Sequence, residues 1–139
     1  MIKATLDTNI LVSAFLFPGN ERRALKAAVQ GRFRSMTSPA ILDELGEVLT
    51  RLGVGDHEAE GYIMRIMEVS DVVIPMRLDE VDVRDRGDVK ILECALSGGS
   101  DYIVTGDEDL LSLGEYRGVK MMRTMELLER LSTNEVSDI

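Results

Sequence analysis

Short apolar segments alternate with longer segments of helical periodicity along the whole chain, and this alternation restricts the fold more than any other feature. The strand-like segments are residues 2–6, 33–37, 72–75, 101–105 and 119–122. The segment DYIVT (101–105) is the clearest strand, because it is β-branched and bounded by turn residues. Apolar strands separated by helices are typical of a parallel sheet with helices on both faces. The sequence therefore predicts an α/β fold built as a three-layer α/β/α domain.

Turn and capping residues divide the helical segments from one another. Pro18 and Gly19 end a first helix, and Gly31 ends a second one that Asn20 caps. Further helices are expected from Ser38-Pro39 to about Leu52, from a cap at Asp56 to about Val69, from Asp88 to Gly98-Gly99, and from a cap at Thr124 over 125–131. Residues 76–87 are expected to form a charged loop, and residues 107–113 a short turn. We expect one domain over residues 1–132 and a frayed tail over 133–139.

The composition indicates an ordinary globular protein that works in a reducing, cytoplasmic setting. Hydrophobic residues make up 45% and charged residues 29% of the 139 residues, and Cys94 is the one cysteine. The first residues are polar and charged, unlike a signal peptide, and no apolar run approaches the length of a membrane span. We therefore expect no membrane association.

The net charge of −9 argues against nonspecific binding of nucleic acid through a basic surface. The charge is uneven, however. Residues 1–36 carry six Lys/Arg and two Asp/Glu, and the remainder carries ten against twenty-three. The cations Arg22, Arg23 and Lys26 are candidates for contact with RNA phosphates, although a solvated helix face and turn explains most of these side chains better.

Four acidic residues are expected at the carboxyl edge of the predicted sheet, where function collects in such folds. Asp7 follows the first strand, Asp107 follows the strand DYIVT, Asp88 begins a helix, and Glu44 borders the apolar stripe of the helix 39–52. Converging carboxylates repel one another, so such a cluster indicates a site for a hard divalent cation, Mg²⁺ or Mn²⁺. A metal with open positions is suited to phosphodiester hydrolysis.

Each acid also has a purely structural explanation. Asp7, Asp88 and Asp107 could be helix or turn caps, and Glu44 could be a boundary residue that reaches water. Thr8, Asn9 and Thr105 supply neutral oxygens that could orient a carboxylate or a water, as the outer ligands of a metal site do. Their presence beside the acids favours the functional reading.

The motifs TLDTNILVSAF (5–15) and D-x3-L-x2-A-L with DYIVTGDEDLL (88–111), with an acid on a helix between them, resemble the PIN-domain family. Within that family the chain is most similar to small prokaryotic toxins of toxin–antitoxin pairs. The resemblance implies a five-stranded parallel sheet and a Mg²⁺- or Mn²⁺-dependent ribonuclease whose catalytic and metal-binding acids are Asp7, Glu44, Asp88 and Asp107. It also implies Asn9, Thr105 and Asp109 as secondary candidates, and Asp85 as a competitor of Asp88.

The same resemblance implies hydrolysis of single-stranded RNA, although structured RNA stays open as a substrate, together with a homodimer and a small antitoxin partner. An alternative is a PIN-like module that has lost catalysis and binds RNA or protein. The sequence excludes an enzyme with paired catalytic histidines, because His57 is the one histidine. It also lacks the DxD motif of haloacid dehalogenase phosphatases and the acceptor Asp of a receiver domain.

Overall fold

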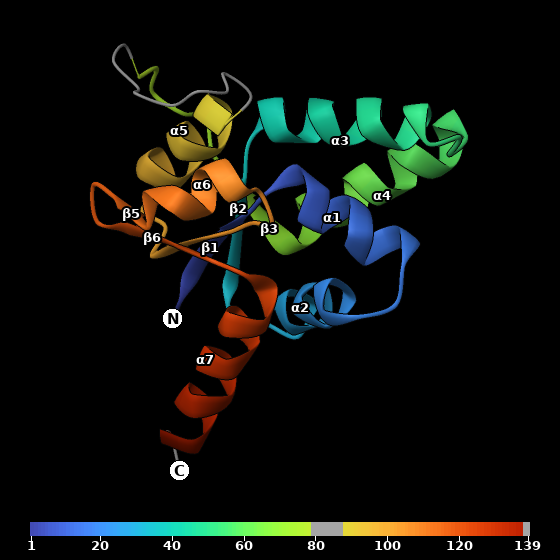
Figure 1. Ribbon diagram of the computed structural model, residues 1–139. Helices are drawn as coiled ribbons and strands as arrows, with labels where there is room; N and C mark the ends of the chain where they lie inside the picture. The colour runs from blue at the N-terminus through green and yellow to red at the C-terminus, as the bar shows by residue number, and fades with distance from the viewer. Residues whose placement is uncertain (79–87, 138–139) are drawn as a thin grey trace.

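A computed structural model describes residues 1–78 and 88–137. Its elements in chain order are β1 (Lys3–Leu6), α1 (Thr8–Leu16), α2 (Asn20–Val29), β2 (Arg34–Thr37), α3 (Pro39–Arg51), α4 (Asp56–Val69), β3 (Ser70–Val72), α5 (Val89–Gly98), β4 (Tyr102–Val104), α6 (Glu108–Leu113), β5 (Glu115–Tyr116), β6 (Val119–Met122) and α7 (Thr124–Ser137). The α/β class expected from the sequence is confirmed, and the sheet has six strands that are mostly parallel where about five parallel strands were expected (Figure 1).

The strands form one sheet in the order β3-β2-β1-β4-β6-β5. The pairs β1–β2, β1–β4, β2–β3 and β4–β6 are parallel, and β5–β6 is antiparallel. The register places Thr5 of β1 opposite Met36 of β2 and Ile103 of β4. β1 is therefore a central strand, and the carboxyl ends of β2 and β4 lie on either side of its own carboxyl end.

The connections place helices on both faces of the sheet. The chain moves from β1 to β2 to β3 in one direction, then returns to β4 and continues to β6 in the other. Because such crossovers are right-handed, the helices of the two halves cover opposite faces. α5 accordingly packs across β1, β2 and β4, and Figure 1 shows α5 and α6 on one side of the sheet and α1, α2 and α4 on the other.

One continuous apolar core fills the space between these layers. Its largest fully buried side chains include Phe33, Leu6, Leu11, Ile41, Leu45, Leu49, Ile66, Ile91, Leu92 and Ile103. β1 has the burial expected of a central strand, since every residue after Lys3 is buried. No helix within the described ranges is both long and apolar enough to serve as a membrane span.

Helix α3 begins as its sequence predicts. The Ser38 hydroxyl accepts a hydrogen bond from the Ile41 N–H at 3.4 Å, and Pro39 occupies the first helical position. Asn20 and Asp56, in contrast, are the first helical residues of α2 and α4 instead of their caps, because Gly19 and Gly55 occupy the cap positions.

Strand β3 was expected over 72–75 but covers Ser70–Val72. Pro75 has no N–H to donate, so it cannot continue a ladder. Beyond it the chain runs along α5, where the Met76 N–H donates to Ser97 Oγ at 2.9 Å and the Leu78 N–H to Glu93 Oε2 at 3.0 Å. The remainder of the expected loop, 79–87, lies outside the described residues and includes Asp85.

Three differences occur near the carboxyl end of the chain. The expected turn at 107–113 is a short helix, α6. The strand β5 was not expected, and it joins β6 through a tight turn in which Arg117 (φ 49°) and Gly118 (φ 88°) are both left-handed. α7 continues to Ser137 instead of ending at 131.

Candidate active site

The switch in strand order lies between β1 and β4, whose following connections run toward opposite edges of the sheet. In open parallel sheets, ligands bind at this point, beside the carboxyl ends of the strands. Asp7 directly follows β1, and Asp107 follows β4 by three residues. The topology alone therefore brings two of the predicted acids to the same place.

A hydroxyl group links these two acids. Thr105 Oγ1 donates a hydrogen bond to Asp7 Oδ2 at 2.6 Å, and the Asp107 N–H donates to the same Thr105 oxygen at 3.0 Å. The Asp7 N–H donates to the Val104 carbonyl at 2.9 Å, which holds its backbone against β4. Asp7 occupies the cap position of α1, but its side chain makes no capping hydrogen bond. Its carboxylate is thus directed to Thr105, as expected for an oriented site residue.

Burial raises the pKa of Asp7 above its usual range. Its side chain is only 8% exposed, so the charged form loses much of its hydration. Hydrogen bonds from the Thr105 hydroxyl and the Thr8 backbone lower the pKa in part, whereas the negative charges of Glu44 and Asp107 raise it further. A cation beside Asp7 would offset the lost hydration of its carboxylate and the repulsion from Glu44 and Asp107.

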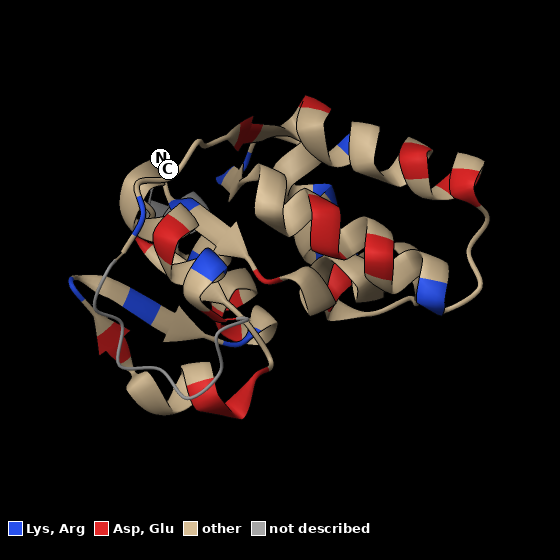
Figure 2. Ribbon diagram, turned by 90° about the horizontal axis from the view of Figure 1, so that it is seen from above, with Lys and Arg blue, Asp and Glu red and all other residues tan. Residues whose placement is uncertain are grey.

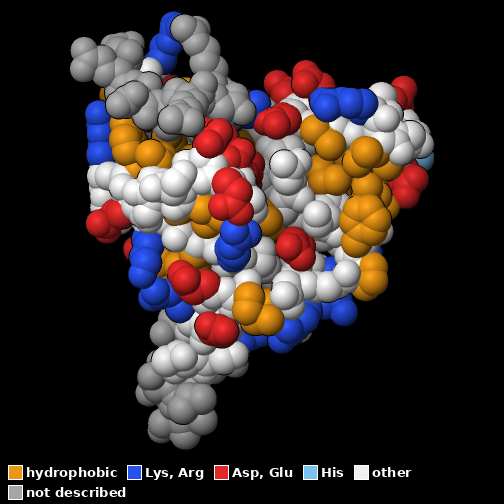
Figure 3. Space-filling model, in the orientation of Figure 1, with side chains coloured by type: hydrophobic (Ala, Val, Ile, Leu, Met, Phe, Trp, Pro, Cys, Tyr) orange, Lys and Arg blue, Asp and Glu red, His pale blue; other side chains and the backbone are white. Residues whose placement is uncertain are grey.

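Carboxylate oxygens of Asp88, Asp107 and Asp109, one from each residue, all lie within 4.8 Å of one another. Oxygen ligands on opposite sides of a Mg²⁺ or Ca²⁺ ion are separated by about 4–5 Å, so this spacing fits a hard divalent cation. Asp88 is buried at the start of α5 and makes no capping hydrogen bond to that helix. Figure 2 shows the acidic start of α6, and Figure 3 shows acidic side chains gathered near it.

Asp107 is also the N-cap of α6, which is the structural role that its sequence position suggested. Its Oδ1 accepts from the Asp109 N–H at 2.8 Å and from the Leu110 N–H at 3.4 Å. One oxygen of Asp107 thus fixes the first turn of α6, and this turn places Asp109 beside it. The two roles are compatible, because a carboxylate has two oxygens.

Glu44 projects from α3, and its Oε2 forms an ion pair with Lys90 Nζ of α5. The side chains are 31% and 29% exposed, so the pair is half-buried. The negative charge of Glu44 contributes to the raised pKa of Asp7. Asp7, Glu44, Asp88, Asp107 and Asp109 together form the acidic centre. Lys90 was not identified from the sequence. Its position in the first turn of a helix, where a positive charge is unfavourable, could have indicated a role outside that helix.

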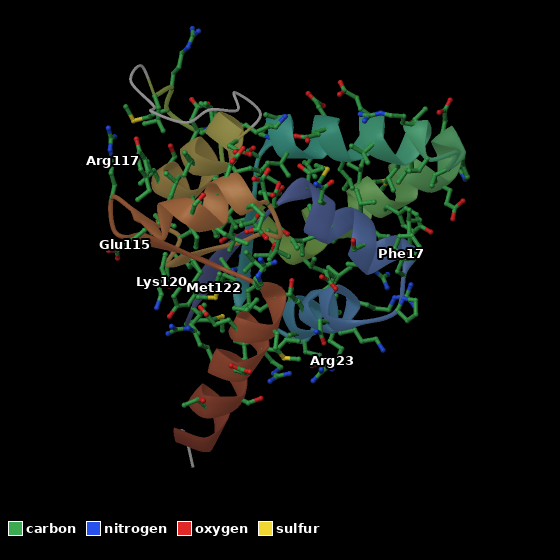
Figure 4. The ribbon with its side chains drawn as sticks, in the orientation of Figure 1. Phe17, Arg23, Glu115, Arg117, Lys120 and Met122 are labelled. Carbon is green, nitrogen blue, oxygen red and sulfur yellow. The ribbon has the colours of Figure 1, made fainter. Side chains whose placement is uncertain are left out.

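The other predicted residues are distributed as follows. Asn9 is exposed on α1. Arg22 Nε and Nη2 donate to the carbonyls of Ala14 and Phe15, at 3.1 and 3.2 Å, and thereby satisfy the end of α1. Arg23 Nη1 donates to Asn20 Oδ1 at 3.3 Å and lies on α2 (Figure 4), and exposed Lys26 lines a hollow with Arg22 and Phe15. The structure does not bring this basic group into the acidic centre.

The domain is therefore of the α/β class, with a mostly parallel sheet and with carboxylates gathered at the point where the strand order switches. The chain matches the PIN domain family over residues 3–109 and belongs to that family, which confirms the resemblance drawn from its motifs. PIN domains are typically nucleases.

Solved structures similar to the chain support the same fold. PAE2754 from Pyrobaculum aerophilum shares 22% identity at a TM-score of 0.64, covering 95% of this chain and 96% of that one. VapBC2 from Rickettsia felis, bound to a DNA fragment from its promoter, contains a chain with 13% identity at a TM-score of 0.62, covering 88% of this chain and 98% of that one. A search of curated proteins finds no match.

Proposed function

We propose that the protein is a Mg²⁺- or Mn²⁺-dependent endoribonuclease that hydrolyses phosphodiesters of single-stranded RNA. The observation that carries this proposal is the convergence of acids from four parts of the chain. Three of them, Asp88, Asp107 and Asp109, offer oxygens within 4.8 Å of one another. The other two, Asp7 and Glu44, interact electrostatically. Membership of the PIN domain family supports the same chemistry.

In the proposed site, Asp88, Asp107 and Asp109 would hold the cation. Asp7 would lie beside it, with its carboxylate oriented by the hydrogen bond from Thr105. A divalent cation bound there supplies the Lewis acidity that phosphodiester hydrolysis needs at neutral pH. Glu44 Oε2 is engaged by Lys90, so Glu44 Oε1 is the oxygen that accepts a proton from the attacking water. The capping hydrogen bonds of Asp107 use its Oδ1, which leaves Oδ2 for the cation.

We further propose that the protein is the toxin of a toxin–antitoxin pair, acts in the cytoplasm, and forms a homodimer. The fold shared with a chain of the VapBC2 complex from Rickettsia felis supports a small antitoxin partner. An antitoxin that covers the carboxyl edge of the sheet would block the acids from RNA. Copurification with the product of an adjacent small open reading frame is the direct test of this partner.

The test of the nuclease is cleavage of a mixed panel of single-stranded RNAs in Mn²⁺, with wild type compared to Asp7→Asn. The asparagine keeps an oxygen that can accept from Thr105 but removes the charge. We expect the variant to lose about 10–100-fold in activity, as for other groups around a metal, and EDTA to abolish wild-type cleavage. Asp43→Asn is the matched control, because Asp43 is an exposed residue of α3 next to Glu44 in sequence.

Equal cleavage by wild type and Asp7→Asn would reject the site. Wild-type protein that binds Mn²⁺ but cuts no RNA would instead favour a PIN-like binding module.

A further inference from the structure

The ion pair between Glu44 and Lys90 is less exposed than two other ion pairs, Arg34–Asp71 and Arg123–Glu108. Its side chains are 31% and 29% exposed, against 47% and 44% for Arg34–Asp71 and 59% and 80% for Arg123–Glu108. Exposed pairs contribute little to stability, and partly buried ones lose hydration in forming. Solvation at the surface therefore does not explain why Lys90 is half-buried beside the acidic centre.

The position of Lys90 in α5 is unfavourable for the helix. Lys90 is the second residue of α5, and the first turn of that helix contains no acidic residue. The amino end of a helix carries partial positive charge, so a lysine there is repelled where an acid would be attracted. The carboxylate of Glu44, on another helix, offsets this repulsion and fixes where the ammonium group lies.

We infer that Lys90 is a substrate-binding residue that contacts a phosphate of the RNA beside the scissile bond, an inference that rests on the proposed function. Glu44 engages one of the three N–H donors of the ammonium group, so two are available for phosphate oxygens. The ion pair holds the ammonium group beside Glu44, one of the carboxylates of the acidic centre. The ammonium group is thus held where a phosphate bound at the acids would meet it.

The need for such a cation follows from the charge of the molecule. The chain has a net charge of −9, and five carboxylates surround the proposed site. A bound divalent cation neutralises only part of that charge, so a polyanion still meets repulsion at the site. The basic residues Arg22, Arg23 and Lys26 do not supply this cation, because all three lie on α2 and Arg22 is hydrogen-bonded to the end of α1.

A purely structural role is the competing explanation. In that case Lys90 serves only to tie α3 to α5, and its loss lowers stability without changing how RNA binding responds to salt. A phosphate contact has a separate signature, because each contact to single-stranded nucleic acid releases counterions. This release contributes about 0.7 to the slope of log affinity against log salt concentration.

The experiment measures binding of a short fluorescein-labelled single-stranded RNA by anisotropy at several salt concentrations. Ca²⁺ replaces Mn²⁺, and a gel verifies that the RNA stays intact. We expect Lys90→Gln to weaken binding and to reduce the slope by about 0.7, and Lys90→Arg to retain the wild-type slope. Lys120→Gln is the control, because Lys120 is an exposed lysine of β6 that extends from the β5–β6 hairpin (Figure 4).

Removing Lys90 alone leaves the Glu44 carboxylate half-buried without its partner. A second comparison therefore tests the lysine in proteins that lack this carboxylate. Glu44→Gln and the double variant Glu44→Gln/Lys90→Gln differ only by the lysine, and the double variant buries no unpaired charge. We expect the slope to fall by about 0.7 between these two variants as well.

An unchanged slope in both comparisons, with thermal stability lowered in Lys90→Gln, would overturn the inference and leave Lys90 as a tie between helices. If wild type binds and cuts RNA in that case, the proposed nuclease stands and only the inference fails. If wild-type protein binds no RNA at all, the proposed function fails and the role of Lys90 fails with it.

Discussion

Single residues in this site show a conflict between stability and function. Asp7 is buried next to two other acids, and its pKa is raised mainly by burial. Such a residue weakens the folded protein whenever it is ionised and has no cation nearby. Active sites commonly keep groups of this kind because the chemistry requires them.

Asp7→Asn should therefore raise the stability of the metal-free protein at neutral pH. Because the pKa of Asp7 is higher in the folded than in the unfolded state, wild type loses stability as the pH rises from 3.8, the usual Asp value, through the folded pKa. The variant lacks this loss. We expect a melting temperature a few degrees above wild type at pH 7 in EDTA, and a difference that shrinks on acidification. Thermal denaturation across pH measures both, and a variant less stable than wild type at pH 7 would contradict the assignment.

The site residues were predictable to different degrees. Asp7 and Asp107 could be placed because each follows a recognisable strand, and strand ends meet at one edge of a parallel sheet. Glu44 could be placed by helical periodicity. Asp109 ranked only as secondary, because its position depends on the turn that Asp107 caps. Lys90 was missed because its partner lies 46 residues away, and nothing local indicates that α3 and α5 meet there.

At the scale of elements, the sequence predicted the elements that are long or strongly patterned and missed the ones that depend on tertiary contacts. β1, β2, β4 and β6 were located within a residue or two. β5 has only two residues, Glu115 and Tyr116, and it exists because β6 pairs with it across a tight turn. The error in β3 has the same origin, since Ser70 is held in the sheet by pairing with Ser35.

The turn between β5 and β6 permits a prediction about stability. Arg117 has φ of 49°, a left-handed conformation that costs a non-glycine residue energy, and the following Gly118 is also left-handed. Asparagine tolerates this conformation better, so Arg117→Asn should stabilise the protein by about 0.5–1 kcal/mol. Chemical denaturation measures the change. Gly118→Ala should act in the opposite direction, and a destabilised Arg117→Asn would indicate that the cation–π contact of Arg117 with Tyr116 outweighs the backbone.

At the scale of the whole molecule, the proposed metal site would link metal binding to folding. The five carboxylates come from four parts of the chain, and their mutual repulsion opposes the compact state in the absence of a cation. A cation that binds only the folded state should stabilise the protein as a ligand does.

Mn²⁺ at about 100 times its dissociation constant should add ~2.7 kcal/mol to the free energy of unfolding. EDTA should reverse the accompanying rise in melting temperature. Asp107→Asn should show a smaller rise, and Asp43→Asn, outside the centre, the full rise. Differential scanning calorimetry with and without Mn²⁺ makes the comparison. Equal shifts in all three proteins would mean that the metal binds elsewhere.

The hydrogen bond from Thr105 to Asp7 joins residues 98 positions apart, and β1 is paired with β4 over a similar separation. A growing polypeptide consequently exposes Asp7 and Glu44 long before the strand and the hydroxyl that fix Asp7 have been synthesised. Up to that moment the first two acids have nothing to hold them in register with the others. If the protein cleaves RNA as proposed, an unfinished chain therefore lacks the assembled site and should not cleave the RNA of the ribosome that is making it.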